Sequence, residues 1–182
     1  MGTNKLLLPF GERTVLGQVI AVLQHCPLGE IVVVTGHEGE HVRASLDRQA
    51  LHHRGLRFVH NPHYATGEML SSVQSGLAAM HGDCDAALIV LSDQPRIERR
   101  VVEQVIAAHK PGAVVVPSFD RRSGHPILID RERWADVLAL PLGANLREVL
   151  RAHADWVCYV NVETETILRD MDTPEDYERM VG

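Results

Sequence analysis

The sequence predicts an α/β fold, with a doubly wound, mainly parallel sheet and helices on both of its faces. Two observations predict it. Short β-branched apolar runs, which suit strands buried on both sides, recur along the chain. Segments with apolar residues at helical spacing separate these runs, and this alternation places crossover helices over both faces of the sheet. The length of 182 residues predicts one domain over residues 1–182.

The predicted strands begin with Ile31–Thr35, a continuous Ile-Val-Val-Val-Thr run that ends at Gly36. Apolar runs of this length, bounded by turn residues, are typical of parallel-sheet strands. Five further runs, of which the first is weaker, lie at residues 56–60, 86–91, 113–116, 127–129 and 156–162. The polar segment 120–124 lies between two of these runs and is predicted to be a mobile loop.

Three segments between the strands each carry an apolar stripe at helical spacing and are predicted helices. They are residues 14–25, 70–80 and 98–109. Thr14 and Thr173 are predicted N-caps, because a threonine hydroxyl can accept a hydrogen bond from a first-turn N–H group. Pro174 suits the first position of a final helix, since its ring presets the helical φ angle.

Composition argues against several classes of function. The chain has 18 Lys and Arg against 24 Asp and Glu, a net charge of −6, and only 4% aromatic residues. Its basic residues are scattered along the chain, so neither a phosphate backbone nor single-stranded bases would find an extended binding surface. We therefore expect no nucleic-acid partner. A small anionic ligand stays possible, because it needs only one or two cations.

The cysteines and the hydropathy of the chain predict its environment. Cys26, Cys84 and Cys158 are widely spaced and form no CxxC pair, which argues against a disulfide framework or a structural zinc site. No apolar run approaches the roughly 20 residues that span a bilayer, and the N-terminus lacks a signal-peptide pattern. These features predict a cytoplasmic protein with no membrane partner.

Two aspartates lie at the ends of predicted elements, where α/β folds often place their ligand-binding residues. Asp93 comes directly after the 86–91 strand, and Asp172 lies in the acidic segment before the last predicted helix. Magnesium accepts one or two protein carboxylates and completes its shell with water and phosphate oxygens, so the pair is a candidate metal site. Taken singly, Asp93 also suits an Asx turn, and Asp172 suits a helix N-terminus favoured by the macrodipole.

Other polar residues are candidate ligand contacts. Lys5 lies in a glycine-flanked segment where it could contact a phosphate, although an exposed lysine is usually solvated. Residues 61–72 run from a strand into a helix whose first-turn N–H and hydroxyl groups could bind a base or a sugar. Ser71 and Ser72 are equally well explained as ordinary first-turn residues. His125, between Gly124 and Pro126, is either a ligand contact or a turn residue.

The chain lacks the sequence motifs of several enzyme classes. The chain has no Gly-x-Ser-x-Gly elbow, no Walker loop and no Gly-x-Gly-x-x-Gly fingerprint. A serine hydrolase is therefore disfavoured, and so is a redox enzyme that uses a nicotinamide cofactor. The 11 histidines show no complete metal-ligand spacing.

Five short motifs occur in a specific order along the chain. They are MGxxKLLLPFG, NPxYxxGxxxS, SDQP, GHP and DMDTPEDY. In this order they resemble the MobA-like nucleotidyltransferases, and among these the molybdenum cofactor cytidylyltransferases, from Met1 to about Tyr177. The resemblance implies a Rossmann-like, three-layer fold of the nucleotide-diphospho-sugar transferase type.

The resemblance also implies a reaction and a set of site residues. The implied enzyme uses Mg²⁺ to transfer CMP from CTP to the terminal phosphate of molybdopterin, and it releases pyrophosphate. A molybdoenzyme or its chaperone is then an expected partner. The implied roles are metal binding for Asp93 and Asp172, catalysis for Lys5 and Asp93, nucleotide binding for these two residues and for Gly2, Gly67, Ser71 and Ser72, and acceptor binding for Gly124 and His125.

The chain departs from the family pattern at its start. The family signature reads LAAGxSxRMGxxK and follows a first strand, whereas this sequence begins at the Met-Gly of that signature. The family's first strand lies between the strands equivalent to residues 31–35 and 86–91, so without it we expect an apolar slot with unpaired strand edges on both sides. We also expect Met1 to be an internal methionine taken as a start.

Two alternatives to the cytidylyltransferase stay open. A related nucleotidyltransferase with another nucleoside triphosphate or another phosphorylated acceptor would carry the same motifs, because fold and motifs define the reaction class better than the acceptor. A catalytically impaired module that binds a nucleotide or cofactor for a molybdoenzyme would explain the absent part of the signature.

Overall fold

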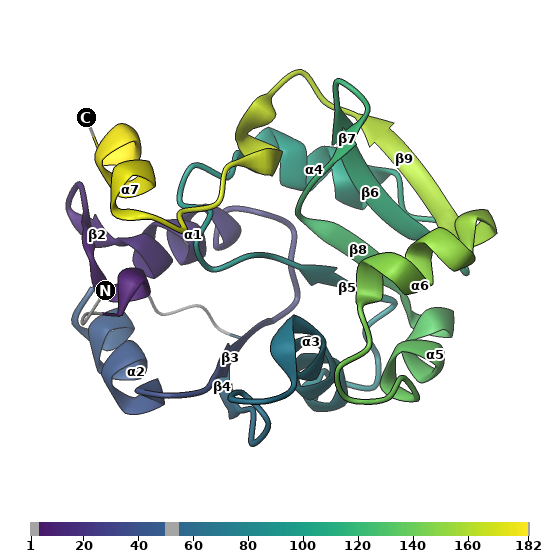
Figure 1. Cartoon of the computed structure of the whole chain (residues 1–182), viewed down its shortest axis with the longest axis horizontal. Coiled ribbons are helices and arrows are strands. Elements are labelled where there is room, and N and C mark those ends of the chain that lie inside the picture. Colours follow the sequence, from purple (N-terminus) through teal and green to yellow (C-terminus); the bar gives the residue numbers. More distant parts are fainter. Residues whose placement is uncertain (1–3, 50–54, 182) are drawn as a thin grey trace.

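The computed structural model describes residues 4–49 and 55–181 (Figure 1). Its strands are β1 (Pro9–Phe10), β2 (Arg13–Thr14), β3 (Ile31–Thr35), β4 (Leu56–His60), β5 (Ala86–Ile89), β6 (Val114–Phe119), β7 (Arg122–Ser123), β8 (Ile127–Asp130) and β9 (Val157–Asn161). Its α-helices are α1 (Val15–Leu23), α2 (Gly39–Arg48), α3 (Glu68–Ala79), α4 (Arg99–Ala107), α5 (Trp134–Leu138), α6 (Leu146–Ala152) and α7 (Pro174–Val181). A short 3₁₀ turn, η1 (Lys5–Leu7), precedes β1.

The central strands form two separate sheets. β3 and β4 form a parallel pair, and β5, β8, β6 and β9 form a larger sheet to which β7 adds a short edge. Strand β8 is antiparallel to both of its neighbours. The chain passes from β6 to β8 through the β7 hairpin, and this connection has no crossover helix that could return the chain in parallel. The predicted, mainly parallel sheet is therefore mixed at β8.

Helices cover both faces of the sheet strands and make the three layers visible in Figure 1. One apolar cluster joins α1, α2 and α4 to β3, and another joins α3, α5 and α6 to β6 and β8. Strand β5 contributes to both clusters, with Leu88 on the first side and Ala87 and Ile89 on the second, as the alternation of side chains along a strand requires. In the part of the chain that the structure describes, no helix has the length and hydrophobicity needed to cross a bilayer.

The predicted helix starts are confirmed by hydrogen bonds. The Thr14 hydroxyl accepts a hydrogen bond from the Gly17 N–H group at 3.1 Å and caps α1. At the start of α7, Thr173 and Asp176 exchange hydrogen bonds, each accepting from the other's N–H group. Such reciprocal bonds satisfy N–H groups that a helix start would otherwise leave unpaired. They fix the direction in which α7 leaves the preceding acidic segment.

The polar segment predicted as a mobile loop is held in a tight hairpin. Asp120 and Arg121 both have positive φ angles, 48° and 62°, which is the conformation that two-residue hairpin turns require. Ser118 and Phe119 pair with Ser123 and Arg122 on either side of the turn. The polarity of the segment therefore reflects turn chemistry.

A slot separates the two sheets. Within residues 4–49 and 55–181, β3 pairs only with β4 and the near edge of β5 has no strand partner. An apolar cavity of about 800 Å³ lies between the two strands and is lined by both of them and by helices α1 and α3. The expected slot between these strands is confirmed.

Candidate functional site

The central feature of the site is one ammonium group that binds two carboxylates. The Lys5 Nζ atom lies 2.7 Å from Asp93 Oδ2 and 2.9 Å from Asp172 Oδ1. The three residues come from η1, from the loop after β5 and from the segment before α7. The two carboxylate oxygens can lie no farther apart than the sum of these distances, so Asp93 and Asp172 occupy one small region of the surface.

Buried neighbours hold each of these side chains in place. The Met171 N–H group donates a hydrogen bond of 3.1 Å to the Asp93 carbonyl, which ties the two acidic segments together. Met171 is fully buried against Val15 and Met180, so Asp172 follows an anchored residue. At η1, the Asn4 side chain accepts a hydrogen bond from the Leu6 N–H group and fixes the turn that carries Lys5.

The charges at this site are unbalanced. Two carboxylates share one ammonium group, which leaves one net negative charge. Burial of Lys5 acts to lower its pKa, but hydrogen bonds and charge interactions with Asp93 and Asp172 outweigh burial and raise the pKa. The Asp93 side chain is 19% exposed and that of Asp172 is 66% exposed. Solvent and small ligands can therefore reach both carboxylates.

The donor set at this site suits a hard divalent cation. Carboxylate oxygens are the protein ligands that Mg²⁺ prefers, and Mg²⁺ usually takes only one or two of them because it keeps waters or phosphate oxygens. Among the described residues, no group of three or more His, Cys, Asp or Glu side chains could hold a metal. Asp93 and Asp172 thus offer part of the shell of a divalent cation that would bind together with a phosphate-bearing ligand, and they do not form a complete cage.

The second group of predicted residues surrounds the start of α3. Asn61 is fully buried, and its amide donates hydrogen bonds to the hydroxyl oxygens of Ser71 at 2.8 Å and Ser72 at 3.1 Å. A side chain at Gly67 would meet Ser71, since a Cβ atom built there lies 2.4 Å from the Ser71 Cβ atom. Ser71 is buried and Ser72 is half-buried. The first-turn serines are therefore held by the strand end that precedes them.

Ser72 connects this second group with the first. Ser72 and Asp93 both line the cavity between β3 and β5, whereas the buried Gly67 and Ser71 do not. Asn61 was predicted only as part of the segment 61–72. Its position at the carboxyl end of the β4 strand is the signal that could have identified it, because a fully buried amide there needs polar partners.

The third group lies between β7 and β8. The His125 N–H group donates to the Ile167 carbonyl at 3.0 Å, and a Cβ atom at Gly124 would approach that carbonyl to 2.2 Å. The Gly124 position therefore requires glycine. Burial, with a smaller contribution from the positive charge of Arg147, lowers the pKa of His125 to about 4, while Asp93 acts in the opposite direction. His125 is thus a neutral imidazole within the field of Asp93.

The remaining predicted residue, Gly2, lies outside the described residues.

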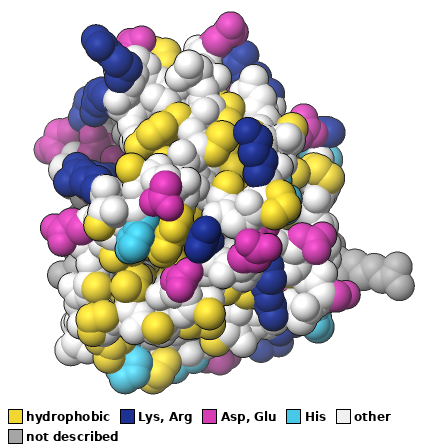
Figure 2. Space-filling model, turned by 90° about the vertical axis from the view of Figure 1, so that its right-hand side faces the viewer, with side chains coloured by type: hydrophobic (Ala, Val, Ile, Leu, Met, Phe, Trp, Pro, Cys, Tyr) yellow, Lys and Arg dark blue, Asp and Glu magenta, His cyan; other side chains and the backbone are white. Residues whose placement is uncertain are grey.

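On the face shown in Figure 2, basic side chains are interspersed with acidic and hydrophobic ones. An anion bound on this face would meet Lys or Arg side chains that are mixed with acidic ones, and no extended basic patch.

An α/β sheet with polar residues beyond the carboxyl ends of its strands is the architecture of nucleotide-binding proteins. The model of the MobA-like NTP transferase domain matches residues 1–156, and the chain belongs to this family. A similar curated protein is the molybdenum cofactor cytidylyltransferase of Escherichia coli (strain K12), which is 28% identical over 97% of this chain and 86% of its own length.

Solved structures show the same architecture. A Mycobacterium sp. strain JC1 homologue of Rv0371c superposes with a TM-score of 0.83 at 25% identity, over 100% of this chain and 88% of its own. Mycobacterium tuberculosis Rv0371C, solved as a complex with manganese, gives a TM-score of 0.81 at 22% identity over 99% and 92% of the two chains. The predicted α/β nucleotidyltransferase fold is thereby confirmed.

Proposed function

We propose that this protein transfers CMP from CTP to the terminal phosphate of molybdopterin and releases pyrophosphate. The family supports a nucleotidyltransferase, and the E. coli relative is a molybdenum cofactor cytidylyltransferase. The observation that carries the proposal is the convergence of Asp93 and Asp172 on Lys5. Transfer of a nucleotidyl group needs alignment of the reactants and neutralisation of charge. This site offers two carboxylate ligands for a metal ion beside the ammonium group of Lys5.

Asp93 and Asp172 would hold the metal ion in this proposal. When bound, Mg²⁺ neutralises charge on the triphosphate and favours the loss of pyrophosphate. The fit rests on the donors: both carboxylates are accessible, and the site carries a net negative charge in the absence of a ligand. The anchoring of Met171 keeps the two acidic segments at a fixed separation.

Lys5 would act on the triphosphate. Its ammonium group bridges one oxygen of each carboxylate, Asp93 Oδ2 and Asp172 Oδ1, so each carboxylate keeps a second oxygen for the metal. The third N–H donor of Lys5 would be available to a phosphate oxygen. The raised pKa keeps Lys5 protonated, and a protonated lysine stabilises the negative charge that develops in the transition state.

No protein nucleophile or base is needed for the chemical step. A terminal phosphate oxygen of the acceptor forms a bond to the α-phosphorus of CTP, and the bond from that phosphorus to the bridging oxygen of pyrophosphate breaks. The acceptor phosphate is already anionic near neutral pH. Gly124 and the neutral His125 would bind the acceptor side, where an uncharged imidazole can donate a hydrogen bond from one ring nitrogen and accept one at the other.

The cytosine preference rests on the start of α3. We assign Gly67, Ser71 and Ser72 to the nucleotide side, because Ser72 shares a cavity with Asp93. The Asn61 amide fixes both serine hydroxyl groups, so their orientation is set before a ligand binds. Such preorganisation suits discrimination between bases, since an unmatched base would leave buried polar groups unpaired.

The test is pyrophosphate release with CTP, GTP or ATP, each with Mg²⁺ and with or without molybdopterin. We expect release with CTP and molybdopterin only, and a loss of about 1,000-fold in Asp93→Asn. Asp170→Asn, an exposed position two residues from Asp172, is the matched control and should retain activity. Turnover with GTP alone would contradict the assignment of the serines, and full activity of Asp93→Asn would contradict the mechanism.

A further inference from the structure

Gln94, which follows Asp93 in the chain, carries a buried amide group that the proposed reaction does not use. Its side chain is 3% exposed. The amide nitrogen Nε2 donates a long hydrogen bond of 3.4 Å to the Ile167 carbonyl. The amide oxygen Oε1 has no hydrogen-bond partner within residues 4–49 and 55–181. Buried polar groups are normally paired, so this unpaired oxygen calls for an explanation.

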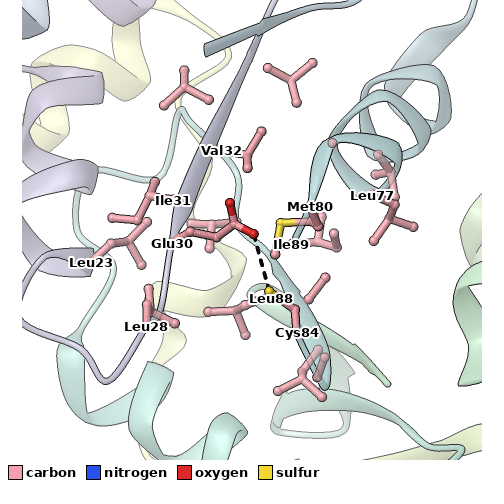
Figure 3. Close-up of a pocket in the computed structure, with 18 of the residues that line it drawn as sticks. Leu23, Leu28, Glu30, Ile31, Val32, Leu77, Met80, Cys84, Leu88 and Ile89 are labelled. Carbon is pink, nitrogen blue, oxygen red and sulfur yellow. Dashed lines mark hydrogen bonds between the residues drawn. The ribbon is translucent and has the colours of Figure 1, made fainter. Parts of the chain in front are cut away.

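Glu30, near the amino end of β5, shows the usual arrangement of a buried polar group. Its carboxylate accepts hydrogen bonds from the His81 N–H group and from the Cys84 thiol, and Figure 3 shows the second of these contacts. Gln94 cannot reach a comparable state by rotating its amide group. The reverse orientation would place two oxygens against each other, because the partner at Ile167 is itself an acceptor.

The unpaired oxygen of Gln94 acts against stability. A buried acceptor without a donor destabilises the folded state, whereas an apolar side chain of the same length fills the space without that loss. Methionine has this length. Packing therefore does not explain a glutamine at this position. The feature that distinguishes glutamine from methionine here is the hydrogen bond from its Nε2 atom to the Ile167 carbonyl.

The Ile167 carbonyl also accepts a hydrogen bond from the proposed acceptor side. The His125 N–H group donates to it at 3.0 Å, and a carbonyl oxygen has two lone pairs for two donors. The Ile167 side chain is 2% exposed and belongs to an apolar cluster with Val101 and Val162, so the position of the carbonyl is fixed by packing. Gln94 and His125 are therefore held by one anchored acceptor.

The chain that follows Ile167 returns to the metal-binding loop. The Met171 N–H group donates to the Asp93 carbonyl at 3.1 Å, and the Met171 side chain is fully buried. This segment thus contacts the loop twice, once through the backbone of Asp93 and once through the side chain of Gln94. Because its first residue also holds His125, a shift of the segment would move Asp93 and His125 relative to each other.

We infer that Gln94 is a positioning residue, which sets the separation between Asp93 and His125 through the Ile167 carbonyl. In this role Gln94 contacts neither the metal nor the substrates. Reacting groups need close alignment, and a displacement of about 1 Å can reduce a rate by about 100-fold. The role rests on the proposed function, which assigns Asp93 to the metal and His125 to the acceptor.

The test replaces Gln94 with methionine, and Gln24→Met is the matched control. Gln24, at the end of α1, also has a buried amide atom that lacks a hydrogen-bond partner in the described part of the chain. In Gln94→Met we expect kcat for pyrophosphate release to fall by about 10- to 100-fold. The Kd for CTP with Mg²⁺ should change by less than about threefold, since the metal ligands stay in place. Gln24→Met should leave both quantities unchanged.

A second readout does not need activity. Hydrogen exchange is measured at the amides of His125 and Met171, which hold the two ends of the connecting segment. Gln94→Met should speed exchange at both amides by about fivefold, because a hydrogen bond that resists local opening is lost. The midpoint of urea unfolding should stay the same or rise, since the unpaired oxygen is gone. A residue that acts only in packing would change stability and local exchange in the same direction.

Gln94→Asn separates the reach of the side chain from its polarity. Its amide is one methylene shorter and falls short of the Ile167 carbonyl, so this variant should match Gln94→Met in kcat and in exchange.

Slower turnover and faster exchange at both amides in Gln94→Met, but not in Gln24→Met, would support the positioning role. Unchanged turnover and exchange in Gln94→Met would overturn it, as would wild-type kcat in Gln94→Asn. A lower unfolding midpoint in Gln94→Met without faster local exchange would also overturn it, because Gln94 would then act in packing alone. Absence of turnover in the wild type would contradict the proposed function, and exchange at His125 and Met171 would still decide whether Gln94 holds the segment.

Discussion

The two ends of β5 each bear an acidic group, and they differ in how completely its charge is satisfied. At the amino end, the Glu30 carboxylate is 4% exposed and accepts hydrogen bonds from Arg57, the His81 N–H group and the Cys84 thiol. At the carboxyl end, Asp93 and Asp172 share the single ammonium group of Lys5 and are open to solvent.

The difference distinguishes a carboxylate whose charge is satisfied within the fold from two carboxylates that could bind a ligand. Burial acts to raise the pKa of Glu30, but its hydrogen bonds to Arg57, His81 and Cys84 lower it overall, so Glu30 stays ionised with every oxygen in use. A carboxylate without free lone pairs stabilises the fold and has little capacity for a metal ion. Unbalanced carboxylates at the other end have that capacity, and substitutions at the two ends should therefore have opposite effects.

The largest effect is expected at the carboxyl end. Asp93→Asn should reduce pyrophosphate release by about 1,000-fold, which corresponds to about 4 kcal/mol. The free energy of unfolding should change by less than about 1 kcal/mol, because the Lys5 ion pairs are partly exposed. Steady-state kinetics and urea titration measure the two quantities. A large loss of stability with modest loss of activity would show that Asp93 resembles Glu30.

Glu30→Gln should show the reverse pattern. We expect a loss of about 2–3 kcal/mol in the free energy of unfolding, because a buried, charge-assisted network loses its anion. Since the folded pKa of Glu30 is lowered from 4.5, its stabilisation is present above about pH 4.5 and is lost as pH falls through the folded pKa. Urea titrations from pH 3 to 7 should find the variant less sensitive to acid. Equal acid sensitivity would contradict the structural role of Glu30.

His125 extends the comparison to a group that is buried without charge. Its pKa falls to about 4 in the folded protein against an ordinary value of 6.5. The unfolded chain therefore binds more protons between these values, and stability should decrease as pH falls from about 6.5 to 4. His125→Asn should reduce this decrease by about 2 kcal/mol. Nuclear magnetic resonance titration of His125 provides the direct check, and a pKa near 6.5 would contradict the stated burial.

The smallest effect is expected at Cys84, where the donor to Glu30 is a weak one. Cys84→Ser keeps a hydrogen-bond donor and should change the free energy of unfolding by less than about 1 kcal/mol. Cys84→Ala removes the donor and should cost more than the serine variant. Urea titration of both variants makes the comparison. A larger loss for serine than for alanine would mean that the thiol acts in packing and that its hydrogen bond to Glu30 contributes little.

The parts of this fold that were predictable are those whose signal is local. The β3 strand agrees residue for residue with its apolar run, and Thr14 caps α1 as its position suggested. Helix α2 escaped prediction because its sequence is polar and only Val42, Ser45 and Leu46 are buried. Tertiary packing, more than an apolar stripe, selects the helix there.

The site was predictable only in part for a related reason. Motif order indicated Asp93 and Asp172, and strand topology explains why residues distant in sequence reach one edge. Their shared contact with Lys5 depends on the path of η1 and on the buried Met171, which no local pattern encodes. The Glu30 network could not be predicted either, because its partners lie on two segments that are distant from Glu30 in the sequence.

The central claim is that Asp93 and Asp172 act together on a metal-bound triphosphate, and isothermal titration calorimetry with CTP tests it most directly. In the wild type we expect Mg²⁺ to strengthen CTP binding by about tenfold or more, since the ion links the carboxylates to the phosphates. In Asp93→Asn and in Asp172→Asn this enhancement should disappear, while Asp170→Asn should retain it. An undiminished effect of Mg²⁺ in both site variants would contradict the account.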